Sequence, residues 1–312
     1  MRGRNECPKD FESYWQRALS EMRGTGTEFE LEPAGPKLPF AECFEMWFTG
    51  TGGARIHARL ARPKLTGCKM PLVLRFHGYS QAAGDFASLL SWTAAGFCCA
   101  VLDCRGQGGY SEDNLAVVGN TLHGHIIRGL SEQSPDRLYY RNVFLDTVQL
   151  ADILASQPWI DASRIGAYGA SQGGGLTIAC AALSDKISRA AFQMPFLCDY
   201  RMIWENGYAT DAYLELQQYF RRFDPQHKHE NELFTRLGYI DAHNLAKKIT
   251  CPVRMYTGLM DSTCPPCTQF AAYNNISAPK SVQFYYDFWH EEYYPGQPDD
   301  LIQFMMKMPD DR

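Results

Sequence analysis

Long hydrophobic runs are missing from this sequence of 312 residues. The nearest approach is the stretch from Leu176 to Leu183, which is far shorter than the roughly 20 apolar residues that a membrane-spanning helix needs. The segment from Met1 to Phe11 carries several charged side chains and has no apolar core of the kind found in secretory signals. We therefore expect no membrane span and no export.

Basic tracts are missing as well. The chain has 30 Lys and Arg residues against 35 Asp and Glu residues, which gives a formal net charge of -5. Nucleic acids and anionic membranes are bound largely through clustered positive charge. The composition therefore argues against such electrostatic attraction, and we expect neither nucleic acid nor membrane among the partners.

Cysteine usage argues against a disulfide framework. The 11 cysteines are odd in number, and Cys98 and Cys99 lie inside the apolar run from Phe97 to Leu102, where cysteine behaves as a small buried hydrophobe. A chain of this length can also bury a large core without covalent cross-links. These features predict a reduced, cytoplasmic protein.

The chain contains no internal repeat and no evident linker, so we expect one domain over residues 1–312. Near its start, Phe11, Trp15, Leu19 and Met22 recur at helical spacing, which predicts a helix over about 11–22 with Asp10 as its cap.

Short apolar runs then alternate with helical patterns, which predicts an α/β fold with a doubly wound, mostly parallel sheet. The predicted strands are an antiparallel edge hairpin at 43–49 and 55–62, followed by 72–76, 97–102, 164–168, 190–194, 253–257 and 282–286. The predicted helices are 86–95, 142–156, 173–183, 241–248, 267–273 and 301–307. Two stretches, about 110–140 and 199–239, break this rhythm and are expected to be insertions over the carboxyl ends of the strands, where such sheets bind ligands.

A candidate nucleophile lies between the predicted strand at 164–168 and the helix that follows it. The segment from Gly169 to Gly173 reads G-x-S-x-G, with Ser171 at its centre. This motif places a serine in a tight turn between strand and helix, and glycines two residues away on each side leave the necessary room. A glycine-rich turn without chemistry is the alternative, which the flanking strand and helix disfavour.

A serine nucleophile needs a base that is oriented by an acid, and behind this motif the chain order is serine, acid, histidine. Only His290 follows a predicted strand at its carboxyl end. The other histidines after Ser171 are interpreted as surface residues, one inside a helix and two in a charged insertion: His243, His227 and His229.

The preferred acid is Asp261, which follows the predicted strand at 253–257 and comes 29 residues before His290 in the sequence. Asp199 and Asp287 remain alternatives. The backbone amide of Gln172 is expected to donate to the oxyanion that forms during acyl transfer. The second donor is expected to be the amide of Tyr79, in the loop after the strand at 72–76.

Three ordered motifs resemble those of the acetyl xylan esterase and cephalosporin C deacetylase family, carbohydrate esterase family seven. They are the R-G-Q motif at 105–107, the G-x-S-Q-G motif at 169–173 and the H-E motif at 290–291. The likeness extends from the helix near Phe11 to the last predicted helix. It implies an α/β-hydrolase fold and a cytoplasmic serine deacetylase that acts on small acetylated sugars and on cephalosporin C, without a cofactor, as a homohexamer.

The same resemblance implies roles for individual residues. Ser171, Asp261 and His290 take the triad roles, and Tyr79 and Gln172 supply the oxyanion donors. The remaining residues of the matched motifs have structural roles near the site: Arg105, Gln107, Gly169 and Gly173. Other α/β hydrolases, such as a dienelactone-type hydrolase or a peptidase, and a noncatalytic binding protein of the same fold remain open alternatives.

Some weaker signals favour structural interpretations. Cys264 and Cys267 have C-x-x-C spacing, which allows a redox role but is also typical of a helix start here. Pairs of histidines at 123 and 125 and at 227 and 229 lack a third ligand at recognisable spacing, so no metal is predicted. The aromatic residues of the second insertion either line a substrate site or, as we expect, pack on a core of their own: Tyr200, Trp204, Tyr208, Tyr213 and Tyr219.

Overall fold

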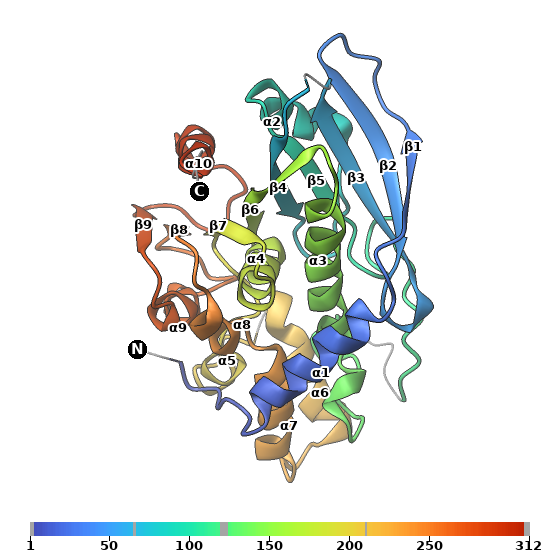
Figure 1. The fold of residues 1–312 in the computed structure, drawn as a ribbon. Helices are drawn as coiled ribbons and strands as arrows, with labels where there is room; N and C mark the ends of the chain where they lie inside the picture. Colours follow the sequence, from blue (N-terminus) through green and yellow to red (C-terminus); the bar gives the residue numbers. More distant parts are fainter. Residues whose placement is uncertain (1–2, 65–66, 119–123, 210, 309–312) are drawn as a thin grey trace.

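The structure of the chain is a computed structural model, which describes residues 3–64, 67–118, 124–209 and 211–308 (Figure 1). Its central element is a nine-stranded sheet with the order β1-β2-β3-β5-β4-β6-β7-β8-β9. The first three strands pair in antiparallel fashion, and all neighbours from β5 to β9 are parallel. The strands are β1 (Phe29–Pro33), β2 (Ala41–Thr49), β3 (Arg55–Pro63), β4 (Met70–Phe76), β5 (Cys98–Leu102), β6 (Ile160–Ala170), β7 (Ile187–Gln193), β8 (Val253–Gly258) and β9 (Lys280–Tyr285).

Helices cover both faces of this sheet. They are α1 (Phe11–Arg23), α2 (Leu90–Ala94), α3 (Tyr139–Ala155), α4 (Gln172–Leu183), α5 (Tyr200–Glu205), α6 (Leu214–Phe223), α7 (Glu230–Leu237), α8 (Ala242–Leu245), α9 (Pro266–Asn275) and α10 (Gln297–Met306). Side chains of α1, α3, α4 and α8 share one large core with one face of the sheet. A smaller core on the other face joins α2 and α10 to β4 and β5. Because both faces are covered, the central parallel strands are apolar throughout, and all five residues of β5 are buried.

The strands and helices predicted from Phe86 onward are present, with shifted ends. The helix expected over 86–95 is a 3-10 turn (Phe86–Leu89) followed by the short α2, and the helix expected over 241–248 is likewise split between α8 and a 3-10 turn. Strand β1 was not predicted: its Phe29 and Leu31 alternate with glutamates, but the strand is short and ends at Pro33. None of the helices in the described ranges is long and apolar enough to cross a membrane.

The N-terminal helix begins as predicted, but its cap differs. Asp10 occupies the N-cap position of α1 without capping the helix through its side chain. Its carboxylate instead accepts a hydrogen bond from the hydroxyl of Tyr239. The prediction of side-chain capping by Asp10 was therefore wrong, because a partner distant in sequence occupies the carboxylate.

The second predicted insertion forms α5, α6 and α7, which lie below the sheet in Figure 1. Its aromatic residues mostly pack on one another, as expected. Tyr200 and Tyr213 are fully buried, and the Trp204 and Phe220 rings lie 4.4 Å apart. Tyr208 is the exception, with 43% of its surface exposed.

Candidate active site

The turn from β6 into α4 holds Ser171 in a strained backbone conformation. Its φ of 55° and ψ of -120° lie in a region that residues with a side chain rarely adopt. The turn is tight because Gly169 and Gly173 approach each other, and a Cβ atom on Gly173 would overlap the carbonyl oxygen of Phe76. This geometry presents the serine side chain at the carboxyl end of β6, half exposed to the cavity described below.

Three side chains from three strand ends meet at this turn. His290 Nε2 lies 3.0 Å from Ser171 Oγ, and His290 Nδ1 lies 2.8 Å from Asp261 Oδ2. Strand β8 pairs with β9, so the loops that carry Asp261 and His290 are neighbours. A carboxylate can only accept, which places a proton on Nδ1 and leaves Nε2 free to accept the serine proton.

The Asp261 carboxylate is buried and held from several directions. Its Oδ1 accepts hydrogen bonds from the backbone N–H groups of Thr263 (2.9 Å) and Cys264 (2.8 Å). Its Oδ2 accepts a further bond from Gln269 Nε2 at 3.3 Å. These donors occupy both carboxylate oxygens and fix the oxygen that faces His290.

Gln193 holds the His290 loop in place, and the sequence reasoning did not find it. This fully buried residue at the end of β7 donates from Nε2 to the carbonyl oxygens of Glu291 (2.8 Å) and Glu292 (3.4 Å). Its own Oε1 accepts from the Tyr168 hydroxyl. A glutamine directly after the apolar run at 190–192, at the carboxyl end of β7, is the signal that could have found it.

The loop after β4 is shaped by His77. Its ring contacts the carbonyl oxygen of Gly78 through Nδ1 at 2.7 Å and accepts from the backbone N–H of Cys104 through Nε2 at 2.9 Å. These partners require the neutral ring with its proton on Nδ1, and burial lowers the pKa of His77. Gln172 Nε2 also lies 3.3 Å from the Gly78 oxygen. The Gly78 carbonyl is thus engaged by side chains at the point where the chain turns into Tyr79.

Tyr79, Ser171 and His290 line a common cavity of about 610 Å³. The cavity extends from Ser171 along the loop from Gly78 to Gly84 and also reaches Tyr168 and Met194. The structure therefore brings the expected nucleophile, base and oxyanion loop to one hollow at the carboxyl ends of the strands.

Arg105 and Gln107 lie behind this cavity. The fully buried Arg105 guanidinium contacts Asp146 through Nε (2.5 Å) and Nη2 (2.7 Å), and it donates from Nη1 to the carbonyl oxygen of Thr51. Gln107 exchanges two amide hydrogen bonds with Gln172, the residue after Ser171. These contacts connect the loop after β5 to α3 and α4.

The C-x-x-C pair divides between two environments. Cys264 is fully buried, and its thiol is hydrogen-bonded with the Ser171 side chain. Burial raises the pKa of the Cys264 thiol well above its usual range, so the group stays protonated and unreactive. Cys267 is exposed in the first turn of α9. Both are free thiols, which fits a helix start better than a redox pair.

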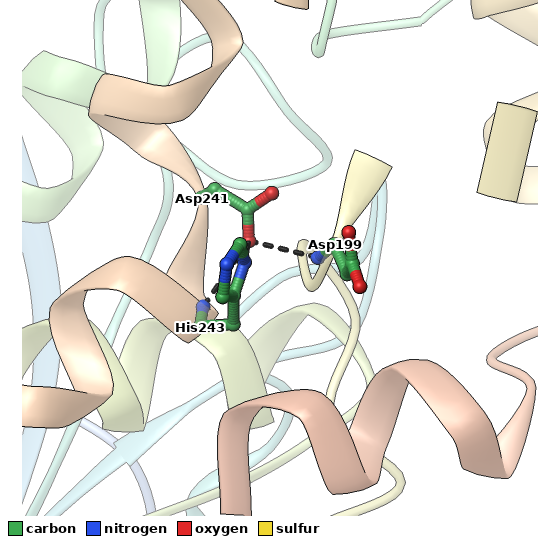
Figure 2. A group of neighbouring side chains, drawn as sticks. All are labelled: Asp199, Asp241 and His243. Carbon is green, nitrogen blue, oxygen red and sulfur yellow. Dashed lines mark hydrogen bonds and ion pairs between the residues drawn. The ribbon is translucent and has the colours of Figure 1, made fainter. Parts of the chain in front are cut away.

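Asp199, Asp241 and His243 form the one group of three buried residues, within the described part of the chain, whose side chains lie close enough to share a metal ion (Figure 2). His243 Nδ1 lies 2.7 Å from Asp241 Oδ1. The carboxylate oxygens also accept from backbone N–H groups, including those of Arg4 and Asn5 on Asp199. Backbone N–H groups point protons at the positions a cation would need, so the donor set fits a hydrogen-bonded hub and not a metal site.

This hub corrects one prediction. His243 is 2% exposed and was wrongly interpreted as a surface residue. A Cβ atom on Gly3 would fall 2.6 Å from the His243 ring, so the N-terminal segment packs directly on it. Asp199 is held here, and Asp287 is exposed, so the structure brings neither alternative acid to His290.

The sequence also singled out the histidine pairs at 123 and 125 and at 227 and 229. His227 and His229 are exposed and lie near Glu230 and Glu232, three residues further on. His125 stacks on the Tyr139 ring at 4.8 Å and makes a tilted contact with the Tyr79 ring at 5.1 Å. His123 lies outside the described residues.

Comparison with known proteins places this arrangement in a family. The family model of acetyl xylan esterases matches residues 1–308. The chain belongs to the acetyl xylan esterase family.

Solved members of this family have nearly the same structure as the chain. Acetyl xylan esterase 1 from Thermoanaerobacterium sp. JW/SL YS485 is 50% identical, with a TM-score of 0.96 over 98% of this chain and 96% of that one. An acetyl xylan esterase from Paenibacillus sp. R4 is 32% identical, with a TM-score of 0.94 over 99% and 97% of the two chains.

A curated relative in this esterase family is longer. An acetyl esterase of Xylanibacter ruminicola is 26% identical over 279 residues, which are 88% of this chain and 61% of that protein. The chain thus spans about three fifths of the length of the curated relative it matches. An acylaminoacyl peptidase of Pyrococcus horikoshii, 19% identical with a TM-score of 0.60, shares the α/β-hydrolase fold alone.

Proposed function

We propose that this member of the acetyl xylan esterase family is a serine esterase that removes acetyl groups from small acetylated sugars such as xylo-oligosaccharides. The observation that carries the proposal is the continuous set of contacts from Asp261 through His290 to Ser171 at the mouth of a cavity. Its relatives of similar structure are described as acetyl xylan esterases.

The proposed reaction is a double displacement. His290 Nε2 removes the Ser171 proton as Oγ attacks the acetyl carbonyl carbon. The ester bond to the sugar then breaks, and the sugar oxygen takes the proton from His290 and leaves as an alcohol. A water molecule, deprotonated by the same nitrogen, then attacks the acetyl-serine and releases acetate. Asp261 stabilises the positively charged imidazole in both steps and keeps its proton on Nδ1.

Charge develops on the carbonyl oxygen in each step. The proposed donors to this oxyanion are the backbone N–H groups of Gln172 and Tyr79, and one such donor is typically worth a factor of about 10² to 10³ in rate. Gln172 begins α4, so its N–H is one of those that helices leave without an internal partner. Tyr79 follows Gly78, whose carbonyl oxygen is contacted by the side chains of His77 and Gln172.

Three finer features rest on the family resemblance: action on cephalosporin C, a cytoplasmic location and assembly as a homohexamer. The cavity is larger than an acetyl group requires, which supports a site that also accepts part of the alcohol portion. Cephalosporin C carries an acetyl ester on a compact bicyclic alcohol, so its deacetylation tests that capacity with a substrate unlike a sugar.

Acetate release from p-nitrophenyl acetate by wild-type protein and by Ser171→Ala tests the proposal. We expect the variant to lose activity by at least about 10³-fold, since the nucleophile is absent. A fluorophosphonate that labels Ser171 in the wild type distinguishes an esterase from a binding protein of the same fold. A series from p-nitrophenyl acetate to butyrate separates a deacetylase from hydrolases with a wider acyl pocket. Unchanged turnover in Ser171→Ala would refute the assignment.

A further inference from the structure

Glu215 is a fully buried acid close to the cavity. It lies in the first turn of α6 and is 1% exposed. The Tyr79 hydroxyl donates to its Oε1 at 3.0 Å, and the backbone N–H of Ile127 donates to its Oε2 at 3.0 Å. Its carboxyl group therefore joins the second insertion to the oxyanion loop and to the first insertion.

The first insertion is shaped around this carboxyl group. Gly124 has a φ of 103°, and a Cβ atom there would overlap the Glu215 carboxyl carbon. The next residue, His125, donates its backbone N–H to the Tyr79 hydroxyl at 2.9 Å. The hydroxyl of Tyr79 is thus fixed by a donor and an acceptor at once, and burial raises the pKa of Tyr79, which keeps that proton in place.

The ring of Tyr79 is held as firmly as its hydroxyl. It contacts the His125 ring in a tilted arrangement and the Phe196 ring in a T-shaped one, with centroid distances of 5.1 and 5.7 Å. A ring fixed at its hydroxyl and packed against two other rings leaves its Cα little freedom. The backbone N–H of Tyr79, one of the two proposed oxyanion donors, is then positioned from the side-chain end.

We propose that Glu215 is a positioning residue, which aligns the Tyr79 amide for the oxyanion when its carboxyl group is ionised. This inference rests on the proposed esterase function. Both carboxyl oxygens accept hydrogen bonds, which fits the ionised form. A proton bound to Oε1 would occupy one of the lone pairs with which this oxygen accepts the Tyr79 hydroxyl proton.

Burial also affects the pH at which this carboxyl group becomes charged. Burial raises the pKa of Glu215 to about 8, although the backbone N–H groups of residues 125–127 and the Tyr79 hydroxyl oppose the shift. The other ionisable groups that face it are the hydroxyls of Tyr140 and Tyr200, whose pKa values are themselves raised by burial and which stay neutral. The His125 ring faces Tyr79.

The test is the pH dependence of kcat for p-nitrophenyl acetate in wild type, Glu215→Gln and Tyr79→Phe. In the wild type, we expect kcat to rise through an ionisation near pH 8 as Glu215 becomes charged. Glu215→Gln should lack this rise, with kcat about tenfold lower at pH 9 and KM changed less than about twofold. The loss is smaller than the about 10² to 10³ for a missing oxyanion donor, because the amide is displaced and not removed.

Tyr79→Phe keeps the ring and the backbone amide but removes the contact with Glu215. It should show the same loss, and the double variant should lose no more than the larger single loss, because both changes break one connection. Glu232→Gln, in the exposed face of α7, is the matched control and should keep the wild-type profile. Circular dichroism checks that each variant is folded, and Tyr79→Phe alone carries the test if Glu215→Gln is not.

The possible outcomes distinguish failure of the role proposed for Glu215 from failure of the proposed esterase function. A wild type that releases acetate without an ionisation near pH 8, or losses that add in the double variant, would overturn the role of Glu215 while leaving the esterase function intact. A wild type that releases no acetate would overturn both. Loss of the rise in both single variants with unchanged KM supports the inference.

Discussion

The burial of Glu215 also leads to a prediction for the stability of the fold. Burial raises the pKa of Glu215 to about 8 in the folded protein, from the ordinary value of 4.5. Between these two pH values the folded state holds a proton that the unfolded state has released. Stability then falls as pH rises, because folding must take up that proton, and the sign is opposite to that of a carboxylate in a salt bridge.

The magnitude follows from the size of this interval. One extra proton in the folded state changes the free energy of unfolding by roughly 1.4 kcal/mol per pH unit. Between pH 5 and pH 8 this amounts to a few kcal/mol, reduced by whatever relaxation lets water reach the carboxyl group. Glutamine does not titrate, so the stability of Glu215→Gln relative to wild type should rise by that amount over the same interval.

Urea unfolding at pH 5, 6, 7 and 8 measures the difference. The contributions of all other titrating groups are shared by the two proteins and cancel, provided that the slope against urea is the same for both. Glu232→Gln, compared with wild type in the same way, should give a flat difference. A flat difference for Glu215→Gln as well would show that the carboxyl group is solvated or paired in solution, and the reasoning from its burial would be refuted.

Two further changes test the site itself. Asp261→Asn should lower kcat by about 10⁴-fold with little change in KM, because asparagine favours the wrong imidazole tautomer, whereas Asp287→Asn should behave as wild type in the same ester assay. Gly173→Ala should yield little folded protein or one that a fluorophosphonate no longer labels, because its Cβ would overlap the Phe76 carbonyl; soluble, fully labelled protein would contradict the tight turn.

The sequence predicted the contacts among Ser171, Asp261 and His290 because a parallel sheet imposes them. Each residue lies on the turn or loop after a predicted strand, and parallel strands bring their carboxyl ends to one edge. The order of the strands was not needed for this inference, only their direction. Residues that lie on loops after strands are therefore the part of a site that pattern reasoning reaches most reliably.

Glu215 and His243 show where such reasoning fails. Both lie in short helices, where a charged or polar residue ordinarily faces water. Their burial depends on segments about 90 to 240 residues away in sequence, namely the loop at 124–127 and the N-terminal residues that pack on His243. No local pattern records such a partner, so the burial of neither side chain could be predicted. Strand β1 was missed for another reason: its Phe29 and Leu31 alternate with glutamates, but the strand is short and ends at Pro33.

The parts of the site carried by the sheet and by the insertions should differ in how they tolerate substitutions. Ser171, His290 and Asp261, the proposed triad, are carried by the sheet, whose central strands move little without loss of the whole fold. The Tyr79 side of the site is held through Glu215 by two insertions, and insertions can vary while the sheet stays intact. Changes in residues 124–127 or in α6 should therefore alter kcat through the oxyanion without disturbing the contacts of His290. The ratio of the rate of Ser171 labelling by a fluorophosphonate to the rate of ester turnover would separate a displaced oxyanion donor from disturbed contacts of His290. Both processes need His290, but they respond differently when the acyl oxygen is displaced.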